Sequence, residues 1–401
     1  MQMNRAWRTQ LITVGLAVFS MFFGAGNLMY ALDLGRKYQN QTPLALVGFL
    51  LTAVCLPVVG VWSICLFNGN YHAFFARAGK YTGGFMTALT LAVLGPFVAM
   101  PRIVGLSYVM LQPYVGVSLF GFTLAFLLLT FACCVTESRI LDLLGRWISP
   151  ALMISLAILF VAAWCHPSEI GQSYMSPLHV VKSSAVSGYS TLDFLVATYF
   201  GSVVVALLCK NSPQAADQPQ QNSRLALYCS SLGLALLALV YVGLAWVGAK
   251  TASPVGLSNE GELLTDLSRQ LLGHWGGLLM AAVVVLACLS TIIALANVLA
   301  EYLKQELFAG RLRYDVSLVI VLLLTATVSN LGLASILELS VPILEIIYPG
   351  IIALTVMNIL HKTSGFKTVN PVVITVFLLS IYLQQERLQL FGQAIKALFT
   401  R

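Results

Sequence analysis

Long apolar runs separated by short polar segments recur along the whole chain. A helix of about 20 apolar residues is long enough to cross the hydrocarbon core of a bilayer. The pattern predicts about eleven such spans, at residues 9–32, 43–67, 84–111, 117–136, 147–165, 191–209, 225–248, 276–300, 315–333, 336–357 and 371–385. We therefore expect an all-α polytopic membrane protein.

Small and polar residues interrupt the first apolar run at its centre, in the segment from Phe19 to Asn27. Gly24 and Gly26 weaken a helix there, because glycine costs about 1 kcal/mol relative to alanine in a helix interior. Unpaired backbone groups at membrane depth are tolerated only where they face protein or a wet cavity. The segment therefore predicts either a local unwinding that binds a ligand or a small-residue packing face that includes Ser20.

A second interruption is expected at Thr198–Ser202, in the sixth predicted span, which comes five spans after the first interrupted one. Broken helices in matching positions of two halves are typical of the binding sites of transporters built from inverted repeats. We therefore expect a single transport domain over residues 1–401, with one repeat at 1–166, a second at 188–358, and a last span and tail at 359–401.

Composition supports the membrane assignment, since 59% of the residues are apolar and 9% are charged, against about 25% charged in soluble domains. The net charge of +7 comes from single Lys and Arg residues scattered over many loops, which is not a nucleic-acid-binding pattern. More of them fall on the side of the N-terminus, which predicts a cytoplasmic N-terminus. The eight cysteines form no CxxC pair, so we expect neither a zinc site nor a resident cofactor.

Three of the charged residues that lie within or at the start of apolar spans are candidates for a structural or functional role. Arg102 follows Pro96 and Pro101, which are expected to kink their helix. Because a buried charge normally faces the bundle interior, Arg102 either pairs with an acid, for which Glu345 is the candidate, or caps backbone carbonyls. Glu345 is interpreted either as a functional carboxyl group or as a neutral hydrogen-bonded acid. Asp193 begins its span and is interpreted as a helix cap.

Several segments together resemble the bacterial branched-chain amino acid carriers of the BrnQ type, in the amino acid–polyamine–organocation superfamily. They are Phe19–Leu28, Gly95–Tyr108, Ala287–Tyr302 and Val328–Pro349. The resemblance covers the chain to about residue 359 and implies cation-coupled uptake of leucine, isoleucine and valine on a leucine-transporter-like fold of five plus five inverted repeats. The chain departs from the family at Met29–Ala31, where a Phe-Pro pair is usual, at Glu345, and in its short C-terminus.

The superfamily resemblance also implies a sodium site between spans 1 and 8. Its ligands here would be the carbonyls of Ser20, Phe23 and Ala287 and the hydroxyls of Ser290 and Thr291. Ala287 and Thr291 share a helix face because they are four residues apart. The alternative is that both hydroxyls bond back to their own helix.

Two segments are expected to bind the substrate. The N–H groups of Gly24, Ala25 and Gly26, together with Asn27, should hold a carboxylate, because helix-terminal amides favour anions. Oxygens of Tyr199, Phe200, Gly201 and Ser202 should take the ammonium group.

The sequence thus predicts a cation-coupled symporter, with sodium preferred, that imports branched-chain or similar neutral amino acids, methionine included, across a bacterial inner membrane. Proton coupling through Glu345 is the alternative within transport. A membrane enzyme would need a cluster of carboxylates or histidines, and no DxxxD, HxxxH or nucleophile motif is present. A channel is the third alternative.

Overall fold

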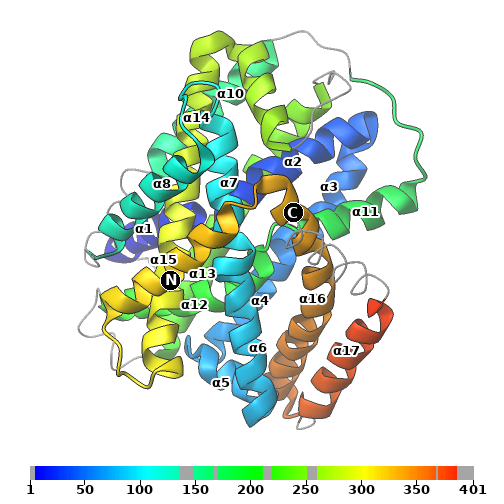
Figure 1. The fold of residues 1–401 in the computed structure, drawn as a ribbon. Coiled ribbons are helices and arrows are strands. Elements are labelled where there is room, and N and C mark those ends of the chain that lie inside the picture. Colours follow the sequence, from blue (N-terminus) through cyan, green and yellow to red (C-terminus); the bar gives the residue numbers. More distant parts are fainter. Residues whose placement is uncertain are drawn as a thin grey trace.

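The structure is a computed structural model that describes residues 5–135, 149–165, 170–210, 219–250, 260–366 and 369–385. Every regular element in these ranges is a helix, which confirms the all-α prediction (Figure 1). Five helices are long and apolar enough to cross a bilayer, or six if one bent pair counts as a single span. Residues 211–218 and the tail from residue 386 lie outside the described residues.

The first half of the chain forms helices that are divided by prolines and glycines. They are α1 (Arg5–Phe22), α2 (Ala25–Tyr38), η1 (Gln39–Gln41), α3 (Thr42–Leu50), the π-helix η2 (Leu51–Cys55), α4 (Leu56–Cys65), α5 (Tyr71–Ala76), α6 (Lys80–Ala92), the π-helix η3 (Val93–Phe97), α7 (Ala99–Leu111), α8 (Leu119–Val135) and α10 (Ser149–Cys165). Gly95 has a non-helical backbone inside η3 and Pro96 follows it, so the expected kink before Arg102 is present.

The second half contains longer helices. They are α11 (Pro177–Tyr189), α12 (Asp193–Lys210), α13 (Pro219–Lys250), α14 (Glu260–Tyr302), η6 (Leu303–Leu307), α15 (Tyr314–Ser329), α16 (Leu333–Ser364) and α17 (Val369–Leu383). α14 bends at Gly273, whose φ is 71°, a value that glycine adopts without strain. α16 continues through Pro342 and Pro349.

The first predicted interruption is confirmed, because α1 ends at Phe22 and α2 begins at Ala25. Gly24 lies between them with an extended backbone, at φ −116° and ψ −169°. Its N–H group donates to Oδ1 of Asn27 at 3.0 Å, so the first turn of α2 caps itself with a side chain. The break therefore presents the start of α2 in the interior of the bundle.

The second interruption was placed wrongly at Thr198–Ser202. α12 is helical from Asp193 to Lys210, and the break lies earlier, at Ser190–Leu192, where α11 and α12 meet at 42°. Leu192 takes the left-handed region there, with φ 70°, which is rare for a residue other than glycine.

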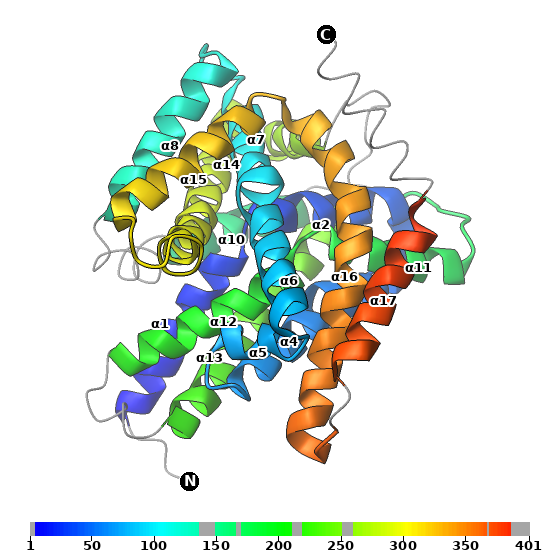
Figure 2. The same cartoon turned by 60° about the horizontal axis from the view of Figure 1, so that its bottom comes forward.

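Helices that are distant in sequence form the packed interior. α13 runs along α1 and α2, α12 packs on α4, α11 on α3, and α14 on α7. Figure 2 shows α1, α12 and α13 side by side, whereas α16 and α17 pair at one edge of the bundle in both views. The α2–α13 contact is close: a Cβ on Gly35 would lie 1.8 Å from the Ala245 carbonyl oxygen, and one on Gly248 2.1 Å from that of Leu32.

Candidate functional site

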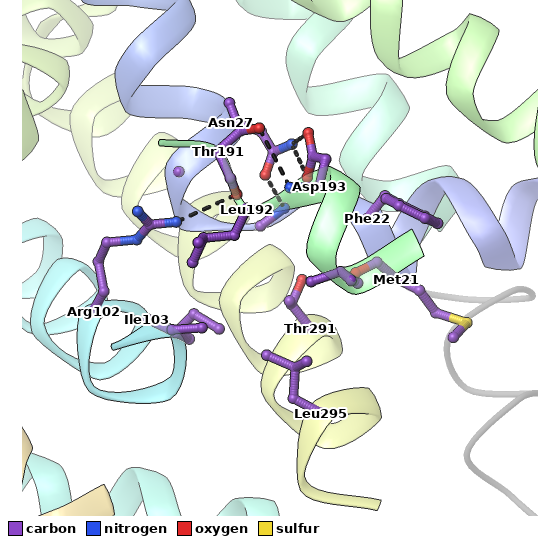
Figure 3. A pocket seen from close by; sticks show the side chains of 14 residues that line it. Met21, Phe22, Asn27, Arg102, Ile103, Thr191, Leu192, Asp193, Thr291 and Leu295 are labelled. Carbon is purple, nitrogen blue, oxygen red and sulfur yellow. Dashed lines mark hydrogen bonds between the residues drawn. The ribbon is translucent and has the colours of Figure 1, made fainter. Parts of the chain in front are cut away.

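A small cavity lies where the two helix breaks meet (Figure 3). It is lined by Met21, Phe22, Gly24, Gly26, Asn27, Ala99, Arg102, Ile103, Thr191, Leu192, Asp193, Val196, Thr291 and Leu295. Its volume is about 20 Å³, which is room for about one water molecule. The cavity must therefore widen before it can hold anything as large as an amino acid.

A buried hydrogen-bonded network joins the two breaks on one side of the cavity. The Asn27 amide nitrogen donates to Asp193 Oδ1 at 3.1 Å and Oδ2 at 2.9 Å, and it also contacts the Tyr241 hydroxyl. That hydroxyl donates to Asp193 Oδ2 at 2.5 Å. Asp193 is 3% exposed. Because a buried charge is tolerated only when it is well hydrogen-bonded, the network accounts for the position of Asp193 inside the bundle.

Arg102 lies on the other side of the cavity and bonds to backbone rather than to an acid. Its Nη1 donates to the Ser190 carbonyl at 2.7 Å and its Nη2 to the Thr191 carbonyl at 3.4 Å. Among the described residues, none of its hydrogen bonds goes to Glu345, which is partly buried in α16. The geometry therefore agrees with a carbonyl cap, and a direct Arg102–Glu345 pair is not formed.

Gly26 is in close contact with the Arg102 guanidinium. A Cβ on Gly26 would lie 2.6 Å from Nη2, so any larger residue here would have to displace the guanidinium from its position beside α2. The guanidinium also lies 5.6 Å from the ring centroid of Tyr30, one turn further along α2. The start of α2 and the second break are thus held together by one cation from α7.

Five oxygens expected at the sodium site lie close together between α1 and α14. The Ser290 hydroxyl is 2.8 Å from the carbonyls of both Ser20 and Ala287. The Thr291 hydroxyl is 3.4 Å from the Phe23 carbonyl and 3.2 Å from that of Ala287. The hydroxyls thus bond both to their own helix and across to the end of α1. Uncharged oxygens grouped in this way can ligate a dehydrated monovalent cation.

The four residues expected to bind the ammonium group lie away from the cavity lining. Tyr199 donates from its hydroxyl to the Thr87 carbonyl at 3.4 Å, and Phe200 packs edge-on against Phe22. A Cβ on Gly201 would lie 3.3 Å from the Ile64 side chain, so this glycine permits close packing of α12 on α4. The Ser202 hydroxyl is buried without a hydrogen-bond partner among the described residues.

Sequence reasoning did not place Asp193, Tyr241 or Leu192 at this site. Asp193 was interpreted only as a helix cap, although an acid at membrane depth is itself a sign of function. Tyr241 lies in an apolar span of α13, and its contact with Asp193 crosses 48 residues of chain, so no local pattern indicates it. Leu192 gives no signal, because its unusual backbone angle follows from the fold.

Comparisons with known proteins agree on one family. The sequence model of the family described as branched-chain amino acid transport protein matches residues 7–400. The branched-chain amino acid transport system 3 carrier protein of Pseudomonas aeruginosa is 33% identical over 89% of this chain and 82% of its own length. The branched-chain amino acid permease BrnQ of Bacillus subtilis is 30% identical over the same shares.

Solved structures support the fold. A crystal structure of the Eremococcus coleocola manganese transporter superposes with a TM-score of 0.61 over 99% of this chain and 94% of that one, at 14% sequence identity. At this level of identity the likeness concerns the architecture alone.

Proposed function

The chain belongs to the family of branched-chain amino acid transport proteins, and on that premise we propose that it is a sodium-coupled symporter that imports leucine, isoleucine and valine across a bacterial inner membrane by alternating access. It is a multi-pass membrane transport protein, not an enzyme.

We infer eleven spans in two inverted repeats of five, followed by one last span, with the N-terminus in the cytoplasm. The two helix breaks, between α1 and α2 and between α11 and α12, support this arrangement because they meet at one cavity, as the broken helices of inverted repeats do. The second repeat then begins with α11 at Pro177 rather than at residue 188, since α11 is the first half of its broken helix. Residues 359–401 contain the eleventh span, α17.

The substrate carboxylate is assigned to the start of α2. The first N–H groups of a helix have no partner within the helix, and together with the helix dipole they favour an anion. Ala25 and Gly26 are the first two residues of α2, and Gly26 lines the cavity. Ile103, Leu192 and Val196 line the same cavity and offer an apolar surface to a branched aliphatic side chain.

The coupling ion is assigned to the oxygens of Ser20, Phe23, Ala287, Ser290 and Thr291. Their convergence between α1 and α14 is the observation that carries the proposal, because none of the five oxygens carries a formal charge and such a site suits a monovalent cation. The same site touches the first break, since a Cβ on Gly24 would lie 3.0 Å from the Thr291 hydroxyl. Ion binding would therefore fix the end of α1 beside the substrate site.

The test is uptake of labelled leucine into proteoliposomes with an imposed sodium or proton gradient. The Ser290→Ala, Thr291→Val double variant should raise the sodium concentration for half-maximal uptake by about tenfold or more, as expected for the loss of two ligands. Its leucine affinity at saturating sodium should change less.

The matched control is Thr325→Val with Ser329→Ala in α15. Both of these hydroxyls are buried and bond back to carbonyls of their own helix, so the sodium dependence should stay at the wild-type value. Uptake by the wild type that ignores sodium and follows a proton gradient would contradict sodium coupling and make Glu345 the leading candidate for a proton-binding group.

A further inference from the structure

We propose that Asp193 binds the α-ammonium group of the substrate through its carboxylate and so sets the preference of the carrier for amino acids over the corresponding α-keto acids. The proposal rests on the function proposed above. It follows from two observations: the backbone carbonyls of the second break each accept a hydrogen bond from this chain, two of them from the cationic side chain of Arg102, and the carboxylate of Asp193 lines the cavity.

The carbonyls at the end of α11 are the obvious alternative partners for an ammonium group, because helix C-termini attract cations. Here each of them accepts a hydrogen bond from within the chain. Thr191 Oγ1 donates to the Gly188 carbonyl at 2.8 Å, and the Tyr348 hydroxyl to the Tyr189 carbonyl at 2.7 Å. Arg102 donates to the carbonyls of Ser190 and Thr191, and the Leu192 carbonyl accepts the Val196 N–H group at 3.0 Å.

Arg102 therefore occupies the place that a substrate cation would otherwise take at this break. Its guanidinium brings a fixed positive charge to the side of the cavity next to Gly26 and the start of α2. An ammonium group would be repelled from that side, and a carboxylate would be attracted to it. The two charged ends of an amino acid are thus directed to different sides of the cavity.

Asp193 provides the opposite charge. It is the one buried acid among the described residues, and Figure 3 shows it beside Asn27, across the cavity from Arg102. A carboxylate has about four acceptor positions. Oδ1 of Asp193 accepts from the Asn27 amide, and the hydroxyl of the neighbouring Thr191 donates to the Gly188 carbonyl instead. An acceptor position therefore remains for a further donor.

Asn27 sets the spacing between the two ends of the substrate. Its Oδ1 accepts the Gly24 N–H group at the first break, while its Nδ2 donates to Asp193 at the second. The side-chain amide of Asn27 therefore bridges the Gly24 N–H group, next to the amides assigned to the substrate carboxylate, and the Asp193 carboxylate. In an α-amino acid the carboxylate and the ammonium group are separated by a single carbon atom.

The experiment measures how well leucine and its α-keto acid, 4-methyl-2-oxopentanoate, inhibit uptake of labelled leucine at saturating sodium. The keto acid keeps the carboxylate and the side chain but lacks the ammonium group. The wild type should require about 10- to 150-fold more keto acid than leucine for half-inhibition. This is the loss of affinity expected when one hydrogen bond to a charged group is missing. In Asp193→Asn this ratio should fall to a few-fold, mainly because leucine binds more weakly.

Asp33→Asn is the matched control. Asp33 is a partly exposed residue of α2 that pairs with Arg36 at 2.6 Å, so the ratio should keep its wild-type value. An Asp193→Asn protein that transports poorly but keeps the wild-type ratio would overturn the proposal, because Asp193 would then be purely structural.

A second variant covers the case in which Asp193→Asn does not fold. Tyr241→Phe leaves Asp193 in place but removes the hydroxyl that donates to its Oδ2 at 2.5 Å. The carboxylate is then freer to bind an ammonium group, and the ratio should rise; an unchanged or smaller ratio would count against the proposal. Failure of the wild type to take up leucine, isoleucine or valine would instead contradict the proposed function itself.

Discussion

The break between α1 and α2 and the break between α11 and α12 meet at one cavity but are built differently. The first consists of Phe23 and Gly24, and its polar groups are mostly backbone, met by hydroxyls from α14. The second consists of Ser190–Leu192, and its carbonyls are covered by side chains from α7 and α16.

This difference separates two tasks that broken helices can perform. The first break leaves the start of α2 facing the cavity, so its backbone is available to a ligand. The second break satisfies its own backbone and offers the side chain of Asp193 instead. A helix interruption at membrane depth is therefore not by itself a backbone binding site; the donors around its carbonyls decide whether it is one.

The largest effect is expected at the first break. Gly26→Leu should lower leucine uptake by at least about 100-fold, because its Cβ would collide with the Arg102 guanidinium and overpacking of this kind costs a few kcal/mol. Uptake into proteoliposomes measures it. Gly84→Leu in α6, where a Cβ would meet no atom within 4 Å, serves as the control, and normal uptake by Gly26→Leu would show that the start of α2 is not part of the site.

A smaller effect, on stability, is expected at the second break. Arg102→Gln should lower the free energy of unfolding by about 2–4 kcal/mol, since two buried carbonyls lose their donors. Chemical denaturation of the purified protein in detergent measures the change. Arg313→Gln removes an exposed pair with Asp315 and should cost less than about 1 kcal/mol. Equal stability of the two variants would mean that the second break does not depend on Arg102.

The smallest effect is expected from Tyr348→Phe, about 1 kcal/mol in the free energy of unfolding. The Tyr189 carbonyl loses the hydroxyl of Tyr348 but still accepts the Leu192 N–H group at 3.1 Å, so it is not left unpaired. Tyr81→Phe, at a residue that is 87% exposed, should be neutral in the same assay. A loss well above 1 kcal/mol would mean that the hydroxyl is essential to the second break.

The sequence predicted the first break and the grouping of oxygens beside it. Gly24 and Gly26 weaken a helix wherever they occur, and the spacing of Ala287, Ser290 and Thr291 places their oxygens on one helix face. These signals are local, so they can be read from a short stretch of chain. The position of α1 opposite α14 came from the family resemblance.

The second break could not be predicted in the same way. Leu192 adopts a left-handed backbone without being a glycine. Gly201, on which the prediction of the second break was based, instead allows α12 to pack closely against α4. The partners of Arg102 are backbone carbonyls, which no residue type reveals. The contact between Asp193 and Tyr241 depends on how α12 and α13 cross, and hydrophobic periodicity carries no information on that.

The seam between α2 and α13 has a consequence for how this protein tolerates mutation. Gly35 and Gly248 each place backbone against backbone, with no room for a methyl group, and even alanine would force the helices apart. In a library of all single substitutions selected for uptake, these two positions should accept glycine alone. Val47 and Leu239, which are more than 60% exposed, should accept most apolar residues. The positions that accept glycine alone would then mark the contact between α2 and α13 in an experiment that measures only cell growth.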